Sequence, residues 1–296
     1  MTAIEIVEVG ARDGLQNEKV ILPTSEKLEL IRQLMANGAR RLEVASFVDP
    51  KRVPQMADAQ EVVAALPVRD DVTYIGLVLN KHGALRAIET QVHELGYVVP
   101  LSESFGMRNQ GKTPAQCLEG IGAIAQLVRE AGRRFQVTLS VAWGCPFDGD
   151  TDPAFVVAAA KEAASHGPVE IALADTIGVA APAQVASLVA AVREAIAPVP
   201  VRVHFHDTRH TGLANVWAAI GAGALIVDSS VGGLGGCPFA PGAAGNIATE
   251  DVIFMLERSG ISTGLDLAGM IGTAHWLEER VGHKCSSALS RAPAYP

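Results

Sequence analysis

The chain has 296 residues, of which 49% are apolar, and its 24 basic and 32 acidic side chains give a formal net charge of −8. The apolar fraction excludes a disordered chain, and the acidic balance argues against a nucleic acid or a membrane surface as a partner. The length suits either two domains or one large α/β domain.

Four cysteines without the spacing of a metal finger predict free thiols in a reducing compartment. The start of the chain shows no basic or apolar leader, and the longest apolar runs are shorter than the ~20 residues that span a bilayer. We therefore expect a cytoplasmic protein without a membrane segment.

Short runs rich in β-branched residues alternate along the chain with segments of helical periodicity. Strands are predicted at residues 4–9, 41–47, 72–79, 92–99, 135–141, 169–174, 201–206 and 225–229. Helices are predicted at residues 25–36, 53–65, 81–89, 114–131, 153–165, 182–196, 212–221 and 247–256. Several of these helices have proline near the first position and glycine after the last, as helices in proteins commonly do.

Eight strands and eight helices in strict alternation predict parallel βαβ units. A closed barrel typically needs about 250 residues, and no strand–GxGxxG–helix motif opens the chain. We therefore predict an α/β fold, a (β/α)8 TIM barrel, rather than a doubly wound sheet. The barrel domain is expected over residues 1–263, and residues 264–296 are expected to form a short C-terminal helical extension, with a helix at 266–281 and a tail packed on the barrel.

In a TIM barrel the reacting groups lie at the carboxyl ends of the strands and in the loops that follow. His204 and His206 are two residues apart on the seventh predicted strand, so both side chains face the same side. Such a pair is typical of metal ligands, although two hydrogen-bonded core histidines fit the spacing equally well. Asp13 follows the first strand, which neighbours the eighth in a closed barrel, so it is either a third ligand or a turn former.

Asn246 comes just before the last predicted helix and has the sequence context of a helix N-cap. Its amide oxygen could still complete a ligand set with one carboxylate and two imidazoles. A mixed oxygen and nitrogen set of this kind suits Mg²⁺ or Mn²⁺, and Zn²⁺ less well.

A glycine-rich segment, residues 232–245, contains six glycines in fourteen residues and includes Cys237. Because glycine at this density costs backbone entropy, we interpret the segment as a lid that carries Cys237 to the active site. The alternative is a tight barrel-closing turn with a buried, inert thiol.

Long segments of the chain resemble the 3-hydroxy-3-methylglutaryl-CoA lyase family. They are VGARDGLQNEK at residues 9–19, SFVDPKRVPQM at 46–56, GCPF at 144–147, DTIGV at 175–179, HFHDT at 204–208, VDSSVGGLGGCPFA at 227–240 and GNIATED at 245–251. The resemblance runs from Ile6 to about Ser287 and implies a TIM-barrel carbon–carbon lyase that depends on a divalent metal. Such enzymes split a tertiary 3-hydroxyacyl-CoA into acetyl-CoA and a keto acid, and the parent reaction belongs to leucine degradation.

The resemblance also implies which residues carry the reaction. The implied metal ligands are Asp13, His204, His206 and Asn246, and the implied catalytic residues include Arg12, Glu43 and Cys237. During cleavage His204 or Asp13 is expected to accept the hydroxyl proton, and Arg12 to stabilise negative charge on the thioester oxygen. Cys237 is expected to protonate the enolate carbon, and Glu43 to hold Arg12 or a relay water. The expected substrate contacts are Arg12, Gln16, Ser46, Thr176 and Arg209.

The chain departs from the usual pattern of this family at three places. Gln136-Val137-Thr138 stands where the family usually has Arg-Gly-Tyr, Arg209-His210 replaces an aromatic residue and a glycine, and Trp143 replaces a smaller residue. Because an arginine–carboxylate contact is charge-assisted and can be bidentate, we expect Arg209, with His210 beside it, to anchor the distal carboxylate of the substrate.

Several functions fit these observations to different degrees. Hydroxymethylglutaryl-CoA lyase, which releases acetoacetate, is the leading interpretation, and cleavage of citramalyl-CoA to pyruvate is the alternative. A condensing enzyme of the isopropylmalate synthase kind would need a longer extension than residues 264–296. An inactive scaffold is disfavoured because the candidate ligands and catalytic residues occur together. We expect an acyl-CoA as the bound partner and a homo-oligomer, with a dimer as its simplest form.

Overall fold

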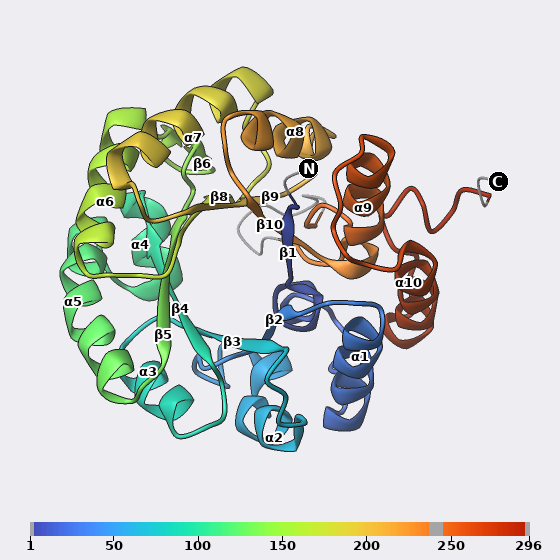
Figure 1. Cartoon of the computed structure of the whole chain (residues 1–296). Coiled ribbons are helices and arrows are strands. Elements are labelled where there is room, and N and C mark those ends of the chain that lie inside the picture. Colours follow the sequence, from blue (N-terminus) through green and yellow to red (C-terminus); the bar gives the residue numbers. More distant parts are fainter. Residues whose placement is uncertain (1–2, 237–244, 294–296) are drawn as a thin grey trace.

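The computed structural model describes residues 3–236 and 245–293. Within these residues eight parallel strands close into a barrel in the order β1-β10-β9-β8-β5-β4-β3-β2, which confirms the predicted TIM barrel. The barrel strands are β1 (Glu5–Glu8), β2 (Arg41–Ser46), β3 (Thr73–Val78), β4 (Glu94–Pro100), β5 (Arg134–Ser140), β8 (Ile171–Asp175), β9 (Val201–Phe205) and β10 (Ile226–Ser229). Figure 1 looks into this ring of strands.

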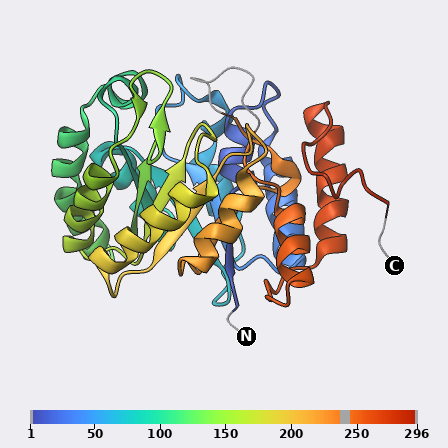
Figure 2. The same cartoon turned by 90° about the horizontal axis from the view of Figure 1, so that it is seen from above.

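Helices cover the outside of the barrel (Figure 1). They are α1 (Thr24–Ala36), α2 (Ala59–Ala65), α3 (Lys81–Ile88), α5 (Pro114–Glu130), α6 (Pro153–Ser165), α7 (Pro182–Ile196), α8 (Gly212–Gly221) and α9 (Thr249–Arg258). In the view of Figure 2 the chain enters β1 at one end of the barrel. Because all barrel strands are parallel, their carboxyl ends meet at the opposite end.

Helix α5 illustrates why the sequence produces these helices. Thr113 caps its start, because the Thr113 hydroxyl accepts a hydrogen bond from the Gln116 backbone N–H and the Gln116 side chain accepts one from the Thr113 N–H. Apolar residues recur on one helix face and pack on β4 and β5; the buried ones include Cys117, Ile121, Ile124 and Val128. Gly132, with a φ of +67°, allows the chain to turn away after the helix.

Several features of the fold differ from the prediction or were not predicted. The helix predicted at 53–65 is a 3₁₀ turn, η2 (Pro54–Met56), followed by α2. The hairpin β6 (Gly144–Cys145) and β7 (Gly149–Asp150) and the helix α4 (Glu103–Gln110) were not predicted. Only Phe105 and Gly106 are buried in α4, so this helix lacks the apolar stripe that sequence periodicity detects.

The last barrel helix begins later than predicted, at Thr249. Asn246 forms a β-bridge with His206 and Ala248 forms one with Ser230, so residues 246–248 pair with the ends of β9 and β10. The prediction that Asn246 is a helix N-cap is therefore wrong, because its backbone is committed to these bridges.

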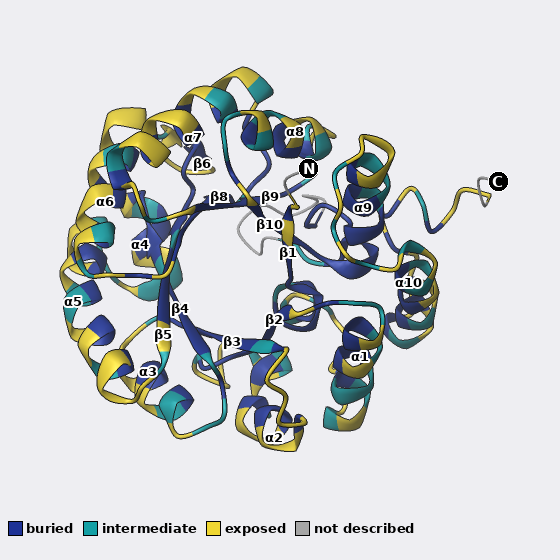
Figure 3. Ribbon diagram, viewed as in Figure 1, coloured by how far each residue is buried: buried dark blue, intermediate teal, exposed yellow. Residues whose placement is uncertain are grey.

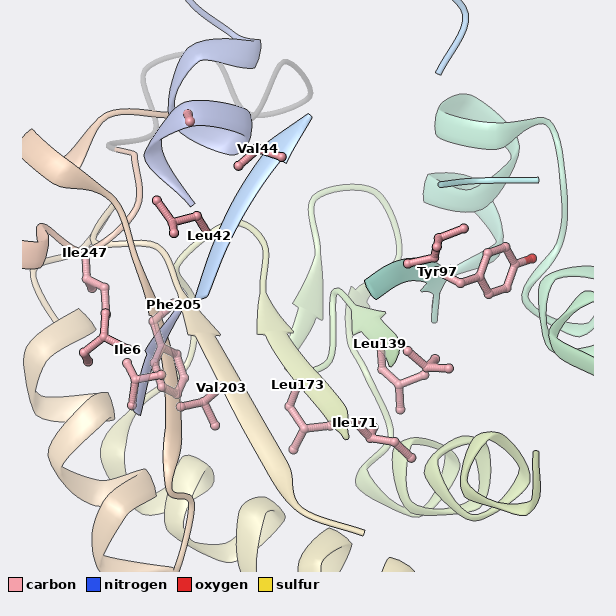
Figure 4. Close-up of a cluster of buried hydrophobic side chains, with 14 of the residues drawn as sticks. Ile6, Leu42, Val44, Tyr97, Leu139, Ile171, Leu173, Val203, Phe205 and Ile247 are labelled. Carbon is pink, nitrogen blue, oxygen red and sulfur yellow. The ribbon is translucent and has the colours of Figure 1, made fainter. Parts of the chain in front are cut away.

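The hydrophobic core lies between the strands and the surrounding helices. Figure 3 shows buried strands inside helices whose outer faces are exposed. Part of this core is drawn in Figure 4, where Ile6, Val203 and Phe205 from β1 and β9 gather near Ile247. Burial of such side chains contributes roughly 1.5–3 kcal/mol each, which makes this layer the main source of stability.

The inside of the barrel is lined by paired charges. Arg41 on β2 is buried and donates to Glu94 at 2.6 Å and to Glu170 at 2.9 Å. Gln136 on β5 is fully buried and donates to the same Glu94 at 2.9 Å. Position 136, one of the departures from the family pattern, thus belongs to this interior network.

An additional helix, α10 (Leu267–Val281), lies outside the barrel against α1 and α9 (Figure 1). Asn37 joins it to α1, because the Asn37 amide donates to Thr273 at 2.9 Å. Beyond α10, Ser286 N donates to Gly232 O at 3.0 Å, so the tail contacts the loop after β10. The division of the chain at residue 263 stays a prediction. Among the residues that the structure describes, no helix has the length and apolar character needed to cross a membrane.

Candidate active site

The first part of the site is a turn that directly follows β1. In this turn, η1 (Gly10–Gly14), Asp13 N donates to Val9 O at 2.8 Å. Glycine at position 10 leaves room for the Glu8 carboxyl group, because a Cβ there would lie 2.7 Å from Glu8 Oε1 and displace it. The turn places Arg12 and Asp13 at the carboxyl end of the barrel.

Arg12 is buried between two carboxylates. Its Nη1 donates to Asp13 Oδ1 and its Nη2 donates to Glu43 Oε2, each at 2.5 Å. Burial disfavours the charged guanidinium, but the negative charges of Asp13 and Glu43 outweigh burial and raise the pKa of Arg12. The side chain is therefore a fixed cation, and Glu43 holds it in place.

His204 and His206 lie at the carboxyl end of β9, and both face Asp13. Their Nε2 atoms are 3.8 Å and 3.9 Å from Asp13 Oδ2. One ligand atom from each of the three residues lies within 4.8 Å of the other two. A cation with metal–ligand bonds of about 2.0–2.3 Å can be shared by atoms at this spacing.

Asp228 on β10 orients one of these histidines. It pairs in register with His204, and its Oδ2 lies 3.1 Å from His204 Nδ1. A carboxylate at the second ring nitrogen is the usual partner of a metal-ligating histidine, because it fixes the ring orientation and directs the other nitrogen toward the ion.

Asn246 completes this group from the loop before α9. Its Nδ2 donates to Asp13 Oδ2 at 2.8 Å and to Leu234 O at 3.0 Å. Its Oδ1 is buried and has no hydrogen-bond partner in the described parts of the chain. Since a buried acceptor without a partner is costly, this oxygen fits a cation ligand. One carboxylate, two imidazoles and one amide oxygen thus suit a divalent metal.

The protonation states favour cation binding by Asp13 and His206. Burial opposes ionisation of Asp13, but Arg12 and then His204 hold its pKa well below the usual range. Burial and the neighbouring His204 lower the pKa of His206 to about 4, so this ring is neutral at pH 7. For His204, Asp228 outweighs burial and raises the pKa. Ionised carboxylates and neutral imidazoles are the forms that bind metals.

These residues line a cavity of about 550 Å³ that also contains Gln16 and Thr176. Gln16 Oε1 is buried without a hydrogen-bond partner among the described residues, and Thr176 Oγ1 accepts from Val141 N at 2.9 Å. The exposed side chain of Arg52 and the half-buried side chain of Lys112 also line the cavity, which marks their side as its mouth.

Other residues expected at the site lie elsewhere. Ser46 is fully buried and does not line the cavity. Arg209 is exposed, and its Nη1 donates to the carbonyl oxygens of Ile177 and Gly178 at 3.0 Å and 2.8 Å. The expectation that Arg209 anchors a substrate carboxylate is therefore corrected: its guanidinium braces a neighbouring loop. Trp143 packs on Phe205 with ring centroids 5.5 Å apart and does not line the cavity. Cys237 lies outside the described residues.

Two buried charged residues that line the cavity were missed in the sequence, Asp228 and Arg202. The signal for Arg202 was present, because it precedes His204 by two residues on a strand and so shares its inward face. For Asp228 the signal was its register with His204, which becomes known only once the barrel is closed.

Glu8 connects the turn after β1 to the loop after β10. It is fully buried and accepts hydrogen bonds from Gly10 N at 2.8 Å, Val231 N at 3.0 Å and Thr249 Oγ1 at 2.6 Å. Burial raises the pKa of Glu8 to about 7. The turn that carries Arg12 and Asp13 is thus held by a carboxyl group that titrates near neutral pH.

The substitution Glu8→Gln is expected to weaken the pH dependence of stability. Folded Glu8 keeps its proton up to about pH 7, whereas the unfolded chain loses it near 4.5, so the folded protein binds more protons in this window and its stability falls as the pH rises. This difference between the folded and unfolded pKa of Glu8 corresponds to roughly 3 kcal/mol in the free energy of unfolding. Denaturant unfolding near pH 4.5 and near pH 7 should show a smaller fall in the free energy of unfolding for Glu8→Gln than for the wild type. Equal falls would contradict the shift.

The HMGL-like family model matches residues 3–276. The chain belongs to this family. Within it, the (R)-citramalyl-CoA lyase of Chloroflexus aurantiacus is 39% identical, over 100% of this chain and 97% of that protein. The hydroxymethylglutaryl-CoA lyase of Bacillus subtilis is 38% identical, over 94% of this chain and 93% of that protein.

The solved structure of an HMG-CoA lyase from Acinetobacter baumannii, in complex with coenzyme A and 3-methylmalate, is also similar to this HMGL-like chain. The TM-score is 0.95 and the identity 40%, over 99% of this chain and 97% of that one. The chain is therefore a lyase of the HMGL-like family with a candidate metal site at Asp13, His204 and His206.

Proposed function

We propose that this lyase cleaves 3-hydroxy-3-methylglutaryl-CoA to acetyl-CoA and acetoacetate with the help of Mg²⁺ or Mn²⁺. The observation that supports it most is the convergence of Asp13, His204 and His206 beside the fixed cation Arg12 in one cavity. Deprotonation of a tertiary alcohol needs a Lewis acid and a base, and the departing thioester enolate needs a positive charge nearby. Asp13, His204 and His206 supply the metal ligands and the base, and Arg12 supplies the positive charge.

A divalent cation bound at the site would lower the pKa of the substrate hydroxyl and orient it. His204 or Asp13 accepts the hydroxyl proton, and the carbon that bore the hydroxyl becomes the keto carbon of the product. The electrons of the broken carbon–carbon bond pass to the thioester as an enolate, which the Arg12 guanidinium stabilises. A proton on the enolate carbon completes acetyl-CoA, and Cys237 stays the predicted donor.

A second candidate substrate is citramalyl-CoA, which the same steps would split into acetyl-CoA and pyruvate. The relative from Chloroflexus aurantiacus, similar over the whole chain, favours it. The two acyl groups differ by one methylene between the hydroxyl-bearing carbon and the carboxylate. A cytoplasmic location and a homo-oligomer, as a dimer, stay predictions.

The proposed function is tested with purified protein, Mg²⁺ or Mn²⁺, and each of the two acyl-CoAs. Release of acetyl-CoA together with acetoacetate supports the first substrate, and release with pyruvate supports the second. The ratio of the two kcat/KM values assigns the preferred acyl group. Absence of acetyl-CoA from both reactions would contradict the proposal.

A further inference from the structure

Among the described residues, the guanidinium of Arg202 makes only long contacts. Its Nη1 is 3.2 Å from Glu170 Oε1, its Nε is 3.5 Å from Asp228 Oδ1, and its Nη2 donates to Thr138 Oγ1 at 3.3 Å. These distances lie at or beyond the long end of the range for N–H···O hydrogen bonds. The Nε is buried and has no hydrogen-bond partner among the described residues, and the same holds for the Nε of Arg12 and Arg41, so the distinction lies in the terminal nitrogens.

Two other buried arginines of the barrel are held more closely. Arg12 donates to two carboxylates at 2.5 Å each. Arg41 donates to Glu94 at 2.6 Å and to both oxygens of Glu170 at 2.9 Å and 3.0 Å. Carboxylates of the protein thus engage these two guanidinium groups at short distance, whereas Arg202 keeps donor capacity for a ligand.

Arg202 lies one layer below the metal-ligand residues, on the same inward face of β9. A separation of two residues along a strand corresponds to about 6.6 Å. Thr138 pairs with Ala172, which pairs with Arg202, so Thr138 lies at the same level. Thr138 and Gly96 both line the cavity, and a Cβ at Gly96 would make only ordinary contact with Gln136 at 3.7 Å. These small residues leave room in the cavity near Arg202.

The charge of the cavity also favours an anionic acyl group. The described residues that line it include four cationic side chains and four carboxylates. A bound divalent cation would therefore leave an excess of positive charge in the cavity, which a substrate anion neutralises. Of the four cations, Arg12 and Arg202 are the buried ones.

We propose that Arg202 binds the distal carboxylate of the acyl group, an inference that rests on the proposed function. The coenzyme A part of the substrate is too large to enter the barrel and must therefore extend outward through the cavity mouth. The far end of the acyl group then points into the barrel. In both candidate acyl groups the carboxylate carbon is the first or second carbon beyond the one that bears the hydroxyl. With that hydroxyl at the metal site, the carboxylate lies at the level of Arg202, whose fork can donate two hydrogen bonds to it.

The test compares two acyl-CoAs that the enzyme cannot cleave because they lack the 3-hydroxyl. Glutaryl-CoA and valeryl-CoA both have five acyl carbons and differ only in a carboxylate or a methyl group at the far end. Their dissociation constants are measured by calorimetry with Mg²⁺, for the wild type and Arg202→Gln. We expect Arg202→Gln to weaken glutaryl-CoA binding by about 10- to 100-fold, as for other charge-assisted bonds, and to leave valeryl-CoA binding nearly unchanged.

Matched variants separate substrate binding from the interior network. Arg202→Lys keeps the positive charge but loses the two parallel N–H donors of the guanidinium, so it should lose part of the preference for glutaryl-CoA. Glu170→Gln removes a partner of Arg202 that does not line the cavity, so the ratio of the two affinities should stay at the wild-type value. The single variant Arg202→Gln leaves the Glu170 carboxylate beside a neutral side chain, which can prevent folding. The double variant Arg202→Gln with Glu170→Gln removes this charge, so it provides the same affinity measurement if Arg202→Gln fails to fold.

Equal weakening of both acyl-CoAs, or no weakening of glutaryl-CoA, would overturn the role of Arg202 and leave the proposed function untouched. A wild-type protein that binds neither acyl-CoA would also overturn the role of Arg202, whereas the proposed function is decided separately by the release of acetyl-CoA from the two hydroxyacyl-CoAs.

Discussion

Replacing His206 with alanine is expected to lower the rate of acetyl-CoA release by several powers of ten while the barrel stays folded. The loss follows because one of the four candidate ligand groups is removed, and ionisation of the substrate hydroxyl then lacks its Lewis acid. Folding should persist because His206 Nδ1 has no hydrogen-bond partner in the described structure, so the ring leaves no protein donor or acceptor unpaired there. The measurement is the cleavage rate together with the metal content after dialysis.

His82→Ala is the control for this variant, because His82 is an exposed histidine on α3 and lies outside the cavity. It should keep the wild-type rate and metal content. Chelator treatment of the wild type should reproduce the low cleavage rate of His206→Ala. Added Mg²⁺ or Mn²⁺ should restore the rate of the chelated wild type but not that of His206→Ala. A chelated enzyme that cleaves at full rate would show that the site needs no metal.

The barrel was predictable because its strands and most of its helices leave local signals. Parallel strands are buried on both faces and appear as apolar runs, and helices such as α5 carry a cap and an apolar stripe. Helix α4 carries a cap at Ser102 but no apolar stripe, and the β6–β7 hairpin has only two residues in each strand. Both elements depend on tertiary contacts that no short window of sequence contains.

The cluster of Asp13, His204 and His206 that forms the candidate metal site was predictable for a related reason. The alternation of side chains along a strand puts His204 and His206 on one face, and closure of the barrel brings Asp13 beside them. Asn246 shows the limit of local signals: its sequence context is that of a helix cap, but a β-bridge to His206 holds it next to Asp13. Cap preference is a local tendency, and the pairing of two distant segments overrides it.

Arg209 and Arg202 show why nearness in sequence is a poor guide to a cavity. Arg209 follows the candidate ligand His206 by three residues, yet the chain has left the strand there and the side chain turns to a neighbouring loop. Arg202 lies deeper in the strand, where the alternation of a barrel strand directs it inward. The direction of a side chain, set by its strand, decides which arginine reaches the cavity.

Arg12→Gln is expected to lower kcat by about a thousandfold or more and to change KM much less. Removal of a single donor to a developing oxyanion typically costs about 10²–10³ in kcat, and Arg12 contributes a full charge that is fixed by two carboxylates at 2.5 Å. Because negative charge on the thioester oxygen arises only as the carbon–carbon bond breaks, the loss falls on the chemical step. Single-turnover rates with either candidate substrate measure this step directly.

Glu43→Gln and Arg12→Lys separate the charge of Arg12 from its position. Glu43→Gln keeps the guanidinium but weakens one of its two anchors, so its loss in kcat should be clearly smaller than that of Arg12→Gln. Arg12→Lys keeps a positive charge that can no longer bridge Asp13 and Glu43 in one plane, so its rate should lie between those of the wild type and Arg12→Gln. If Arg12→Gln instead raised KM at unchanged kcat, Arg12 would bind the substrate and the transition state equally well. The enolate would then need another source of positive charge.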